Sequence, residues 1–281
     1  MRIGTRGSAL ALAQARQVAT LLGGEHDLVE VVTTGDRGEA LSDKERWVRE
    51  LDAALLEGAV DCAVHSAKDV PAQLPVGIVI AAVPPRADPR DALCGAPTLA
   101  ALPEGARIGT SSLRRAAQVR ALRGDVAVVD LRGNVDTRLR KLADGDYDAI
   151  VLAAAGLQRL GRDDAGTPLD DLVPAAGQGC LAVTTRAGEE ELAAAIDHAP
   201  SSRALAAERA LVRALEADCH TPVGAHAQFL APGALTLRAF VGSADGSAWV
   251  RDELGGEEPE SLGAEVAARL LSAGAREVLA P

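Results

Sequence analysis

One sequence pattern occurs twice in this chain and constrains its fold more than any other feature. Residues 2–8 (RIGTRGS) are echoed by residues 107–115 (RIGTSSLRR), and each copy leads into a stretch with helical periodicity. A short apolar strand that turns directly into a helix presents free backbone N–H groups and the positive end of the helix dipole. Two such units, each with Arg side chains beside the turn, predict two α/β lobes that both bind anions.

The charge balance limits what those anions can be. The chain has 29 Lys and Arg residues against 40 Asp and Glu residues, a net charge of -11, so the cations at the two turns are a local feature. Nucleic-acid-binding proteins usually carry a broad basic surface, and an aromatic content of 2% leaves few rings for base stacking. The sequence therefore favours an acidic small molecule.

Composition and length place the chain among globular proteins with a substantial core. Its 281 residues, 48% of them hydrophobic, are enough for two or three domains. No apolar run approaches the roughly 18 residues of a membrane span. The first predicted strand begins at Arg2, so we expect no targeting peptide and a cytoplasmic location. Four well-separated cysteines without zinc-ligand spacing predict plain thiols.

The order of apolar and helical segments predicts three domains. Residues 1–84 form a first α/β lobe, to which residues 180–198 return, and residues 90–174 form a second. The proline-rich residues 84–89 suit a hinge, and residues 161–171 are predicted to be a polar loop. Residues 201–281 predict a small α+β domain with an antiparallel sheet. A ligand cleft between two hinged lobes is the expected result.

Two further segments carry chemical groups at predicted strand ends. Lys68 and Asp69 follow an apolar strand, where an adjacent cation and carboxylate either bind an anion and transfer a proton or form a surface pair. Arg132, Gly133 and Asn134 form another strand-to-helix turn, in which helix capping alone explains Asn134. Each single Arg has the alternative of an ordinary solvated charge.

The cysteines differ in their surroundings. Cys62, Cys94 and Cys180 lie in apolar runs and are expected in the core, whereas Cys219 follows a predicted helix end and lies in a loop. A thiol in such a loop is either a nucleophile or an attachment point.

Taken together, these segments closely resemble the porphobilinogen deaminase family, also called hydroxymethylbilane synthases. The match is an ordered series from residue 2 to about residue 230. It comprises residues 2–8, 34–36 (TGD), 65–71 (HSAKDVP), 88–92 (DPRDA), 109–115 (GTSSLRR), 131–134 (LRGN), 147–150 (YDAI), 177–179 (GQG) and 208–210 (ERA), then Cys219 with Pro222 and Gly224.

The resemblance implies a fold, a reaction and a set of site residues. The first two domains would be similar to type II periplasmic binding proteins. The enzyme, a transferase of haem and porphyrin biosynthesis, would join four porphobilinogen molecules, with loss of ammonia, into hydroxymethylbilane. The primer would be a dipyrromethane cofactor in thioether linkage to Cys219, and Asp69 would be the catalytic carboxylate. Carboxylate groups of cofactor and substrate would be bound by Arg2, Arg6, Ser8, Ser66, Lys68, Thr110, Ser111, Ser112, Arg114, Arg115, Arg132, Gly133, Asn134 and Arg138.

This chain also departs from the family pattern. A short segment with Lys44 and Trp47 stands where a glycine-rich active-site lid is usual, Asp218 replaces the Gly before the cofactor cysteine, and Cys180 replaces an Ala. We expect a monomer without nucleic-acid or membrane partners and without a metal. The alternative is a non-catalytic binding protein for a small anion, which would need neither Asp69 beside Lys68 nor a modified cysteine.

Overall fold

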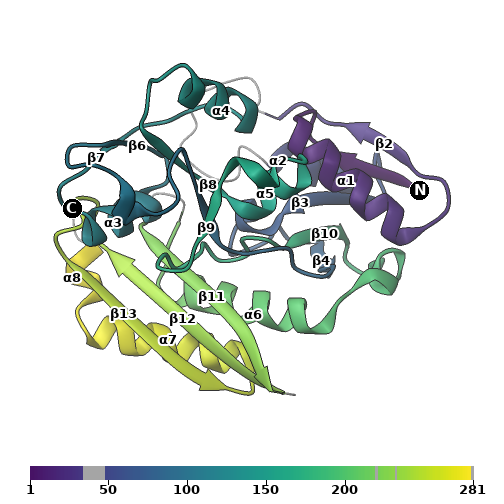
Figure 1. Ribbon diagram of the computed structural model, residues 1–281. Coiled ribbons are helices and arrows are strands. Elements are labelled where there is room, and N and C mark those ends of the chain that lie inside the picture. Colours follow the sequence, from purple (N-terminus) through teal and green to yellow (C-terminus); the bar gives the residue numbers. More distant parts are fainter. Residues whose placement is uncertain (34–47, 219–220, 232, 280–281) are drawn as a thin grey trace.

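Three sheets organise the chain (Figure 1). The computed structural model describes residues 1–33, 48–218, 221–231 and 233–279. The first sheet has the strand order β2-β1-β3-β10-β4. Its strands are β1 (Arg2–Thr5), β2 (Asp27–Glu30), β3 (Cys62–Ser66), β4 (Ile78–Ala82) and β10 (Leu181–Arg186). Strand β1 is parallel to β2 and β3, whereas β10 runs antiparallel to both of its neighbours.

Helices cover both faces of this first sheet. The buried face of α1 (Ala9–Leu22) packs against β1, β3 and β10, and α2 (Arg49–Leu56) contributes Leu51 and Leu55 to the core on the opposite face. Strand β10, within the residues 180–198 that were predicted to return to the first lobe, pairs with β3 and β4.

The second sheet repeats the arrangement of the first. Its order is β7-β6-β8-β5-β9, and β6, the strand of the repeated sequence, lies between two parallel partners just as β1 does. The strands are β5 (Asp91–Cys94), β6 (Arg107–Gly109), β7 (Ala127–Val129), β8 (Ala149–Ala153) and β9 (Thr167–Leu169), and the helices are α3 (Leu113–Leu122), α4 (Val135–Ala143) and α5 (Ala154–Arg159). The sequence repeat is thus a structural repeat.

Local capping explains why a helix begins in each copy. Ser8 and Ser112 are the N-cap residues of α1 and α3, and each hydroxyl accepts a hydrogen bond from a backbone N–H of the first turn. The N–H of Ala11 lies 3.3 Å from Ser8 Oγ, and that of Arg115 lies 3.4 Å from Ser112 Oγ.

The third unit is an antiparallel sheet with helices on one face. Strands β11 (Val223–Ala231), β12 (Ala234–Gly242) and β13 (Trp249–Gly256) pair in sequence order. Helices α6 (Ala199–Ala214) and α7 (Pro259–Ser272) pack on the apolar face, joined by the short α8 (Ala275–Leu279). The predicted α/β fold with two lobes and a small α+β domain is confirmed.

Two strands of the second lobe were not predicted. Residues 161–171, expected to be a polar loop, contain β9, which pairs with β5. The other unpredicted strand is β5. Strand β5 has four residues and β9 has three, so neither is long enough for an alternating pattern to be recognised. No helix in the described part of the chain is both long and apolar enough to cross a membrane.

The packing of α7 on α6 depends on Gly263. A Cβ atom at this position would lie 2.4 Å from the carbonyl oxygen of Ala207 and 2.6 Å from the Cβ of Ala210. Gly263→Ala should therefore lower the free energy of unfolding by about 1–3 kcal/mol. Urea denaturation measures this change.

Gly156 in α5 is the matched control, because a Cβ there would meet its nearest neighbour, Leu10, at an ordinary 3.9 Å. Gly156→Ala should leave stability unchanged or raise it by up to about 1 kcal/mol. Equal effects of the two substitutions would contradict the proposed close approach of α6 and α7.

Candidate functional site

The candidate catalytic carboxylate, Asp69, lies directly after the end of β3. Strand β3 runs directly into a short 3-10 helix, η2 (Ala67–Asp69), which we call the Lys68–Asp69 turn. Both Lys68 and Asp69 are partly buried. The carboxylate of Asp69 has no hydrogen-bond or ion-pair partner within the described structure, so its oxygens are free to accept from a ligand.

Lys68 lies among charges from both lobes. Its Nζ is 3.5 Å from Oε1 of Gln178. Burial lowers the pKa of Lys68 to about 8, and the positive charge of Arg115 in the second lobe lowers it further, while Asp69 opposes the shift. The turn of the first lobe therefore faces the cations of the second.

Arg114 and Arg115, the paired arginines of the second repeat, meet at one buried carboxylate. Asp91, at the start of β5, is 0% exposed. Arg114 Nη1 donates to its Oδ2 at 2.7 Å, and Arg115 Nε donates to its Oδ1 at 2.8 Å. Burial alone would raise the pKa of Asp91, but the two guanidinium groups outweigh burial and hold that pKa below its ordinary value.

The remaining contacts of both arginines are also with the protein. Arg114 Nη1 donates to the carbonyl oxygen of Val173 at 2.7 Å, and Arg115 Nη1 donates to that of Val151 at 3.0 Å. The sequence predicts that both bind ligand carboxylates. Much of their donor capacity is used by the protein itself, and their role toward a ligand stays a prediction.

Gln178 links Lys68 to Asp91, the carboxylate that binds Arg114 and Arg115. It was not among the predicted site residues. Its Nε2 donates to Asp91 Oδ1 at 2.9 Å and to the carbonyl oxygen of Pro89 at 2.7 Å, while its Oε1 faces Lys68. Gly177, with φ +74°, lets the backbone approach the turn, because a Cβ there would lie 2.9 Å from Lys68 N. The Gly-Gln-Gly motif was the sequence signal for this link.

The first repeat supplies polar groups beside the Lys68–Asp69 turn. Ser66 Oγ accepts a hydrogen bond of 2.7 Å from Nε2 of the buried Gln14 on α1. Burial lowers the pKa of His65 on β3 to about 4, with a further contribution from the charge of Arg6. Arg6 therefore lies near the end of β3, and Ser8 caps α1.

The turn before α4 brings a second group of predicted residues together. Arg138 Nε donates to the carbonyl oxygen of Gly133 at 2.7 Å, and its Nη2 lies 3.4 Å from Ser111 Oγ. Burial lowers the pKa of Arg138, and the charge of Arg115 adds to the shift. Arg138 thus belongs to the same group of cations as Arg115.

The other predicted residues of this lobe lie in the same two turns. Asn134 caps α4 by accepting from the N–H of Thr137 at 2.9 Å, which confirms the capping interpretation. Thr110 Oγ1 accepts from the N–H of Ser112 at 3.2 Å. Arg132 is exposed, and its Nε lies 2.9 Å from Asp130 Oδ2.

Arg2 does not join this group. Arg2 begins β1, whereas Arg6 follows the last residue of β1. The two residues therefore lie at opposite ends of this strand. Arg2 Nη2 is 2.6 Å from Asp61 Oδ1. The structure therefore gives Arg2 an ion-pair partner in the protein. Lys44, Trp47 and Cys219 lie outside the described residues.

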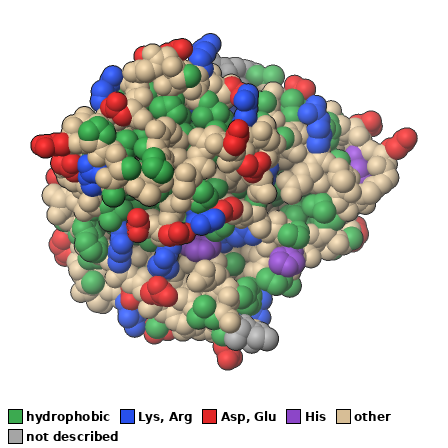
Figure 2. Space-filling model, viewed as in Figure 1, with side chains coloured by type: hydrophobic (Ala, Val, Ile, Leu, Met, Phe, Trp, Pro, Cys, Tyr) green, Lys and Arg blue, Asp and Glu red, His purple; other side chains and the backbone are tan. Residues whose placement is uncertain are grey.

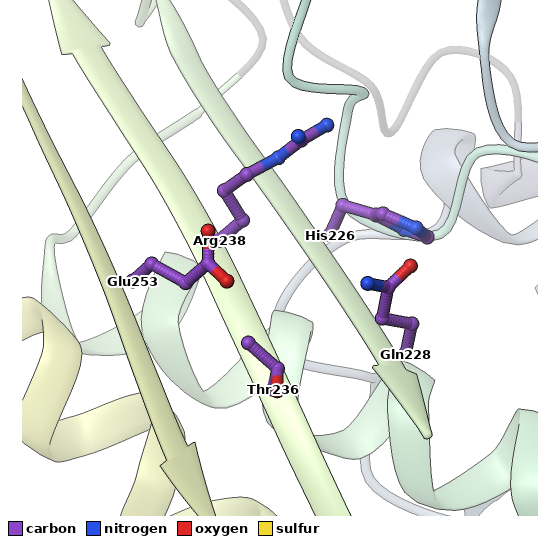
Figure 3. A pocket seen from close by; sticks show the side chains of 5 residues that line it. All are labelled: His226, Gln228, Thr236, Arg238 and Glu253. Atoms are coloured by element: carbon purple, nitrogen blue, oxygen red, sulfur yellow. The ribbon is translucent and has the colours of Figure 1, made fainter. Parts of the chain in front are cut away.

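A separate pocket lies on the third unit. His226, Gln228, Thr236, Arg238 and Glu253 line a cavity of about 50 Å³ on the polar face of β11–β13 (Figure 3). His226 Nδ1 is 3.5 Å from Oε1 of Glu208 on α6. None of the residues of the Lys68–Asp69 turn lines this pocket. On the face drawn in Figure 2, basic and acidic side chains are interspersed.

Comparison with known families places the chain. The model described as "Porphobilinogen deaminase, dipyromethane cofactor binding domain" matches residues 1–194, and "Porphobilinogen deaminase, C-terminal domain" matches residues 203–272. The chain belongs to the porphobilinogen deaminase family.

Curated members of this family match almost the whole chain. The porphobilinogen deaminase of Rubrobacter xylanophilus is 50% identical, over 99% of this chain and 95% of that protein. That of Thermus thermophilus is 47% identical, over 99% and 97%.

Solved structures with a similar arrangement include binding proteins. A periplasmic substrate-binding protein of an ABC transporter from Coxiella burnetii is 15% identical over 74% of this chain and 96% of its own, with a TM-score of 0.41. YhfZ from Shigella flexneri is 21% identical over 77% and 96%, with a TM-score of 0.37.

The cations between the lobes fit the dipyrromethane group named for the family's first domain. That group carries several carboxylates, and a site for it needs uncompensated positive charge beside hydrogen-bond acceptors for pyrrole N–H groups. Burial lowers the pKa of both Lys68 and Arg138, and the charge of Arg115 lowers both further, so three cations lie close enough together to interact here. The carboxylate of Asp69, which has no partner among the described residues, supplies the acceptor.

Asp91→Asn should destabilise the protein strongly, because it leaves two buried guanidinium groups without their carboxylate. We expect a loss of about 3–5 kcal/mol in the free energy of unfolding. Asp170→Asn, at a side chain that is 82% exposed, is the control and should change stability by less than about 1 kcal/mol. Urea denaturation at neutral pH measures both.

The same substitution should change the pH dependence of stability. Because the folded-state pKa of Asp91 is depressed, its contribution is complete above the unfolded-state pKa of about 4 and is lost as the pH falls toward the folded value. The wild type should therefore lose more stability below pH 4 than Asp91→Asn does, and parallel curves would contradict this assignment.

Proposed function

We propose that this chain is a transferase that joins four porphobilinogen molecules, with release of ammonia, into the linear tetrapyrrole hydroxymethylbilane. The observation that carries the proposal is the Asp69 carboxylate, which has no partner among the described residues and stands next to Lys68, a cation close enough to Arg115 of the second lobe to have its pKa lowered by it. Membership of the porphobilinogen deaminase family supports the reaction. Nothing in the relatives favours the alternative of a non-catalytic anion-binding protein.

Asp69 is the proposed catalytic residue. As ammonia leaves, positive charge develops on the pyrrole ring, and a fixed carboxylate that accepts the pyrrole N–H stabilises that charge without reorganisation. The partial burial of Asp69 strengthens this interaction by excluding water from part of its surroundings.

The cations bind and orient the acidic side chains of the substrate. Each porphobilinogen carries an acetate and a propionate, which the guanidinium groups of Arg6, Arg132 and Arg138 match in geometry and Lys68 matches as a point charge. Hydroxyl groups of Ser8, Ser66 and Ser111 lie in the same turns and add donors.

The dipyrromethane cofactor supplies the primer to which new rings are added. We propose that the thiol of Cys219 holds it through a thioether and that Arg132, Arg138 and Thr110 with the neighbouring backbone bind its carboxylates. We also propose that the enzyme acts in the cytoplasm as a monomer, without nucleic acid or a membrane as partner. The net charge of -11 supports the exclusion of nucleic acid.

Mass spectrometry of the purified protein tests the cofactor assignment. The peptide that contains Cys219 should carry two pyrrole units, and the peptides with Cys62, Cys94 and Cys180 should be unmodified, because burial keeps those three thiols in the core. Cys219→Ser should lack the adduct and all activity. Full turnover by a protein without any adduct on Cys219 would contradict the assignment.

Substitution of Asp69 tests the catalytic role. Asp69→Ala should lower kcat by at least a factor on the order of 10²–10³ while the cofactor stays attached. Asp69→Glu should retain part of the activity, since the carboxylate survives with a different reach. Asp170→Ala is the control and should match the wild type. A raised KM with little change in kcat would instead indicate that Asp69 only binds the substrate.

A further inference from the structure

One face of α6 points at the segment that carries Asp69. Leu205, Glu208 and Arg209 are spaced at i, i+3 and i+4, so they share this face of the helix. All three are buried, with exposures of 2%, 0% and 8%. The helix itself packs in the third unit, yet these three side chains reach toward residues of the first lobe and the connection between the lobes.

Arg209 binds the backbone directly after the Lys68–Asp69 turn. Its Nη1 lies 3.4 Å from the carbonyl oxygen of Val70, and its Nη2 donates to the carbonyl oxygens of Pro71 at 2.7 Å and Ala72 at 3.0 Å. One guanidinium group thus holds three successive carbonyl groups, beginning with the residue next to Asp69.

This use of a buried arginine is unusual. The contacts of Arg209 in the described structure are carbonyl oxygens, with no carboxylate among them, so its charge is balanced by dipoles alone. Burial lowers the pKa of Arg209 to about 10, with a smaller effect from Arg213. Burying the Arg209 guanidinium without a carboxylate partner costs stability. This cost suggests that Arg209 contributes to something other than stability.

The two neighbours of Arg209 on this face also support the Lys68–Asp69 turn. Leu205 packs in one apolar cluster with Ala67 and Val70. Glu208 Oε2 accepts the N–H of Gly177 at 2.6 Å, and Gly177 lies against the peptide between Ala67 and Lys68. A single helix of the third unit therefore supports the chain both before and after Asp69 in the sequence.

We propose that Arg209 is a positioning residue for the reaction, which fixes the carboxylate of Asp69 through the backbone of residues 70–72. This inference rests on the proposed catalytic role of Asp69. Because a misplacement of about 1 Å can cost a factor on the order of 10² in rate, small movements of this backbone should be visible in kcat.

The variants are chosen to separate positioning from general stability. Arg209→Met removes all donors, whereas Arg209→Lys keeps the charge and one donor group. Arg213→Met is the matched control, because Arg213 lies on the same helix one turn further on and is exposed. Kinetics, cofactor loading by intact mass and the thermal midpoint are measured for each holoenzyme.

We expect Arg209→Met to lower kcat by a factor on the order of 10–100 with the cofactor still attached, and Arg209→Lys to recover part of the loss. Arg213→Met should stay within about twofold of the wild type. If Arg209→Met behaves like Arg213→Met, the proposal is wrong.

A double-mutant cycle with Asp69→Glu tests the link to the carboxylate and remains available should Arg209→Met not fold. In the Asp69→Glu background the carboxylate is already displaced, so Arg209→Lys should cause a clearly smaller fold-loss than in the wild type. Equal fold-losses in both backgrounds would show that Arg209 acts independently of Asp69 and would overturn the proposal. Full activity of Asp69→Ala would instead overturn the proposed function itself.

Discussion

The fully buried carboxylate of Asp91 is the interaction on which the arrangement of the lobes depends. It accepts hydrogen bonds from Arg114, Arg115 and Gln178, which come from the second lobe and from the connection back to the first. A buried charge has lost its contacts with water, so nearly all of its hydrogen-bond and ion-pair partners must come from the protein. Each missing partner leaves a desolvated polar group. The position of the second repeat's cations is therefore set by the protein before any ligand arrives.

A similar buried carboxylate joins the third unit to the connection between the lobes. Glu208 on α6 accepts from Arg86 at 2.6 Å, from the N–H of Gly177 at 2.6 Å and from the N–H of Ala227 at 2.8 Å. Burial alone would raise the pKa of Glu208, but Arg86 and His226 together outweigh this effect and hold that pKa below its ordinary value. The two carboxylates hold successive residues, Gly177 and Gln178, so the connection between the lobes is fixed from both sides.

The features that the sequence predicted are those with local causes. The two repeat turns and the Asn134 cap depend on residues within one helical turn of each other. The partners of Arg114 and Arg115 could not be derived in this way, because Asp91 stands at the start of a short, otherwise apolar strand. Arg2 shares a motif with Arg6, but the strand between them separates their side chains by its whole length. Closeness in a sequence motif therefore predicts closeness in space only when all residues of the motif lie in one turn.

The placement of β10 has a consequence for the order in which the chain can fold. Ser66 on β3 pairs with Leu181 on β10, so the first sheet is completed only by residues made after the entire second lobe. Contacts so distant in sequence slow folding, because the intervening chain must first be closed into a loop. During synthesis the second lobe can assemble on the ribosome while β3 still has an open edge. Until β10 arrives, the unpaired backbone groups of that edge can pair with other chains.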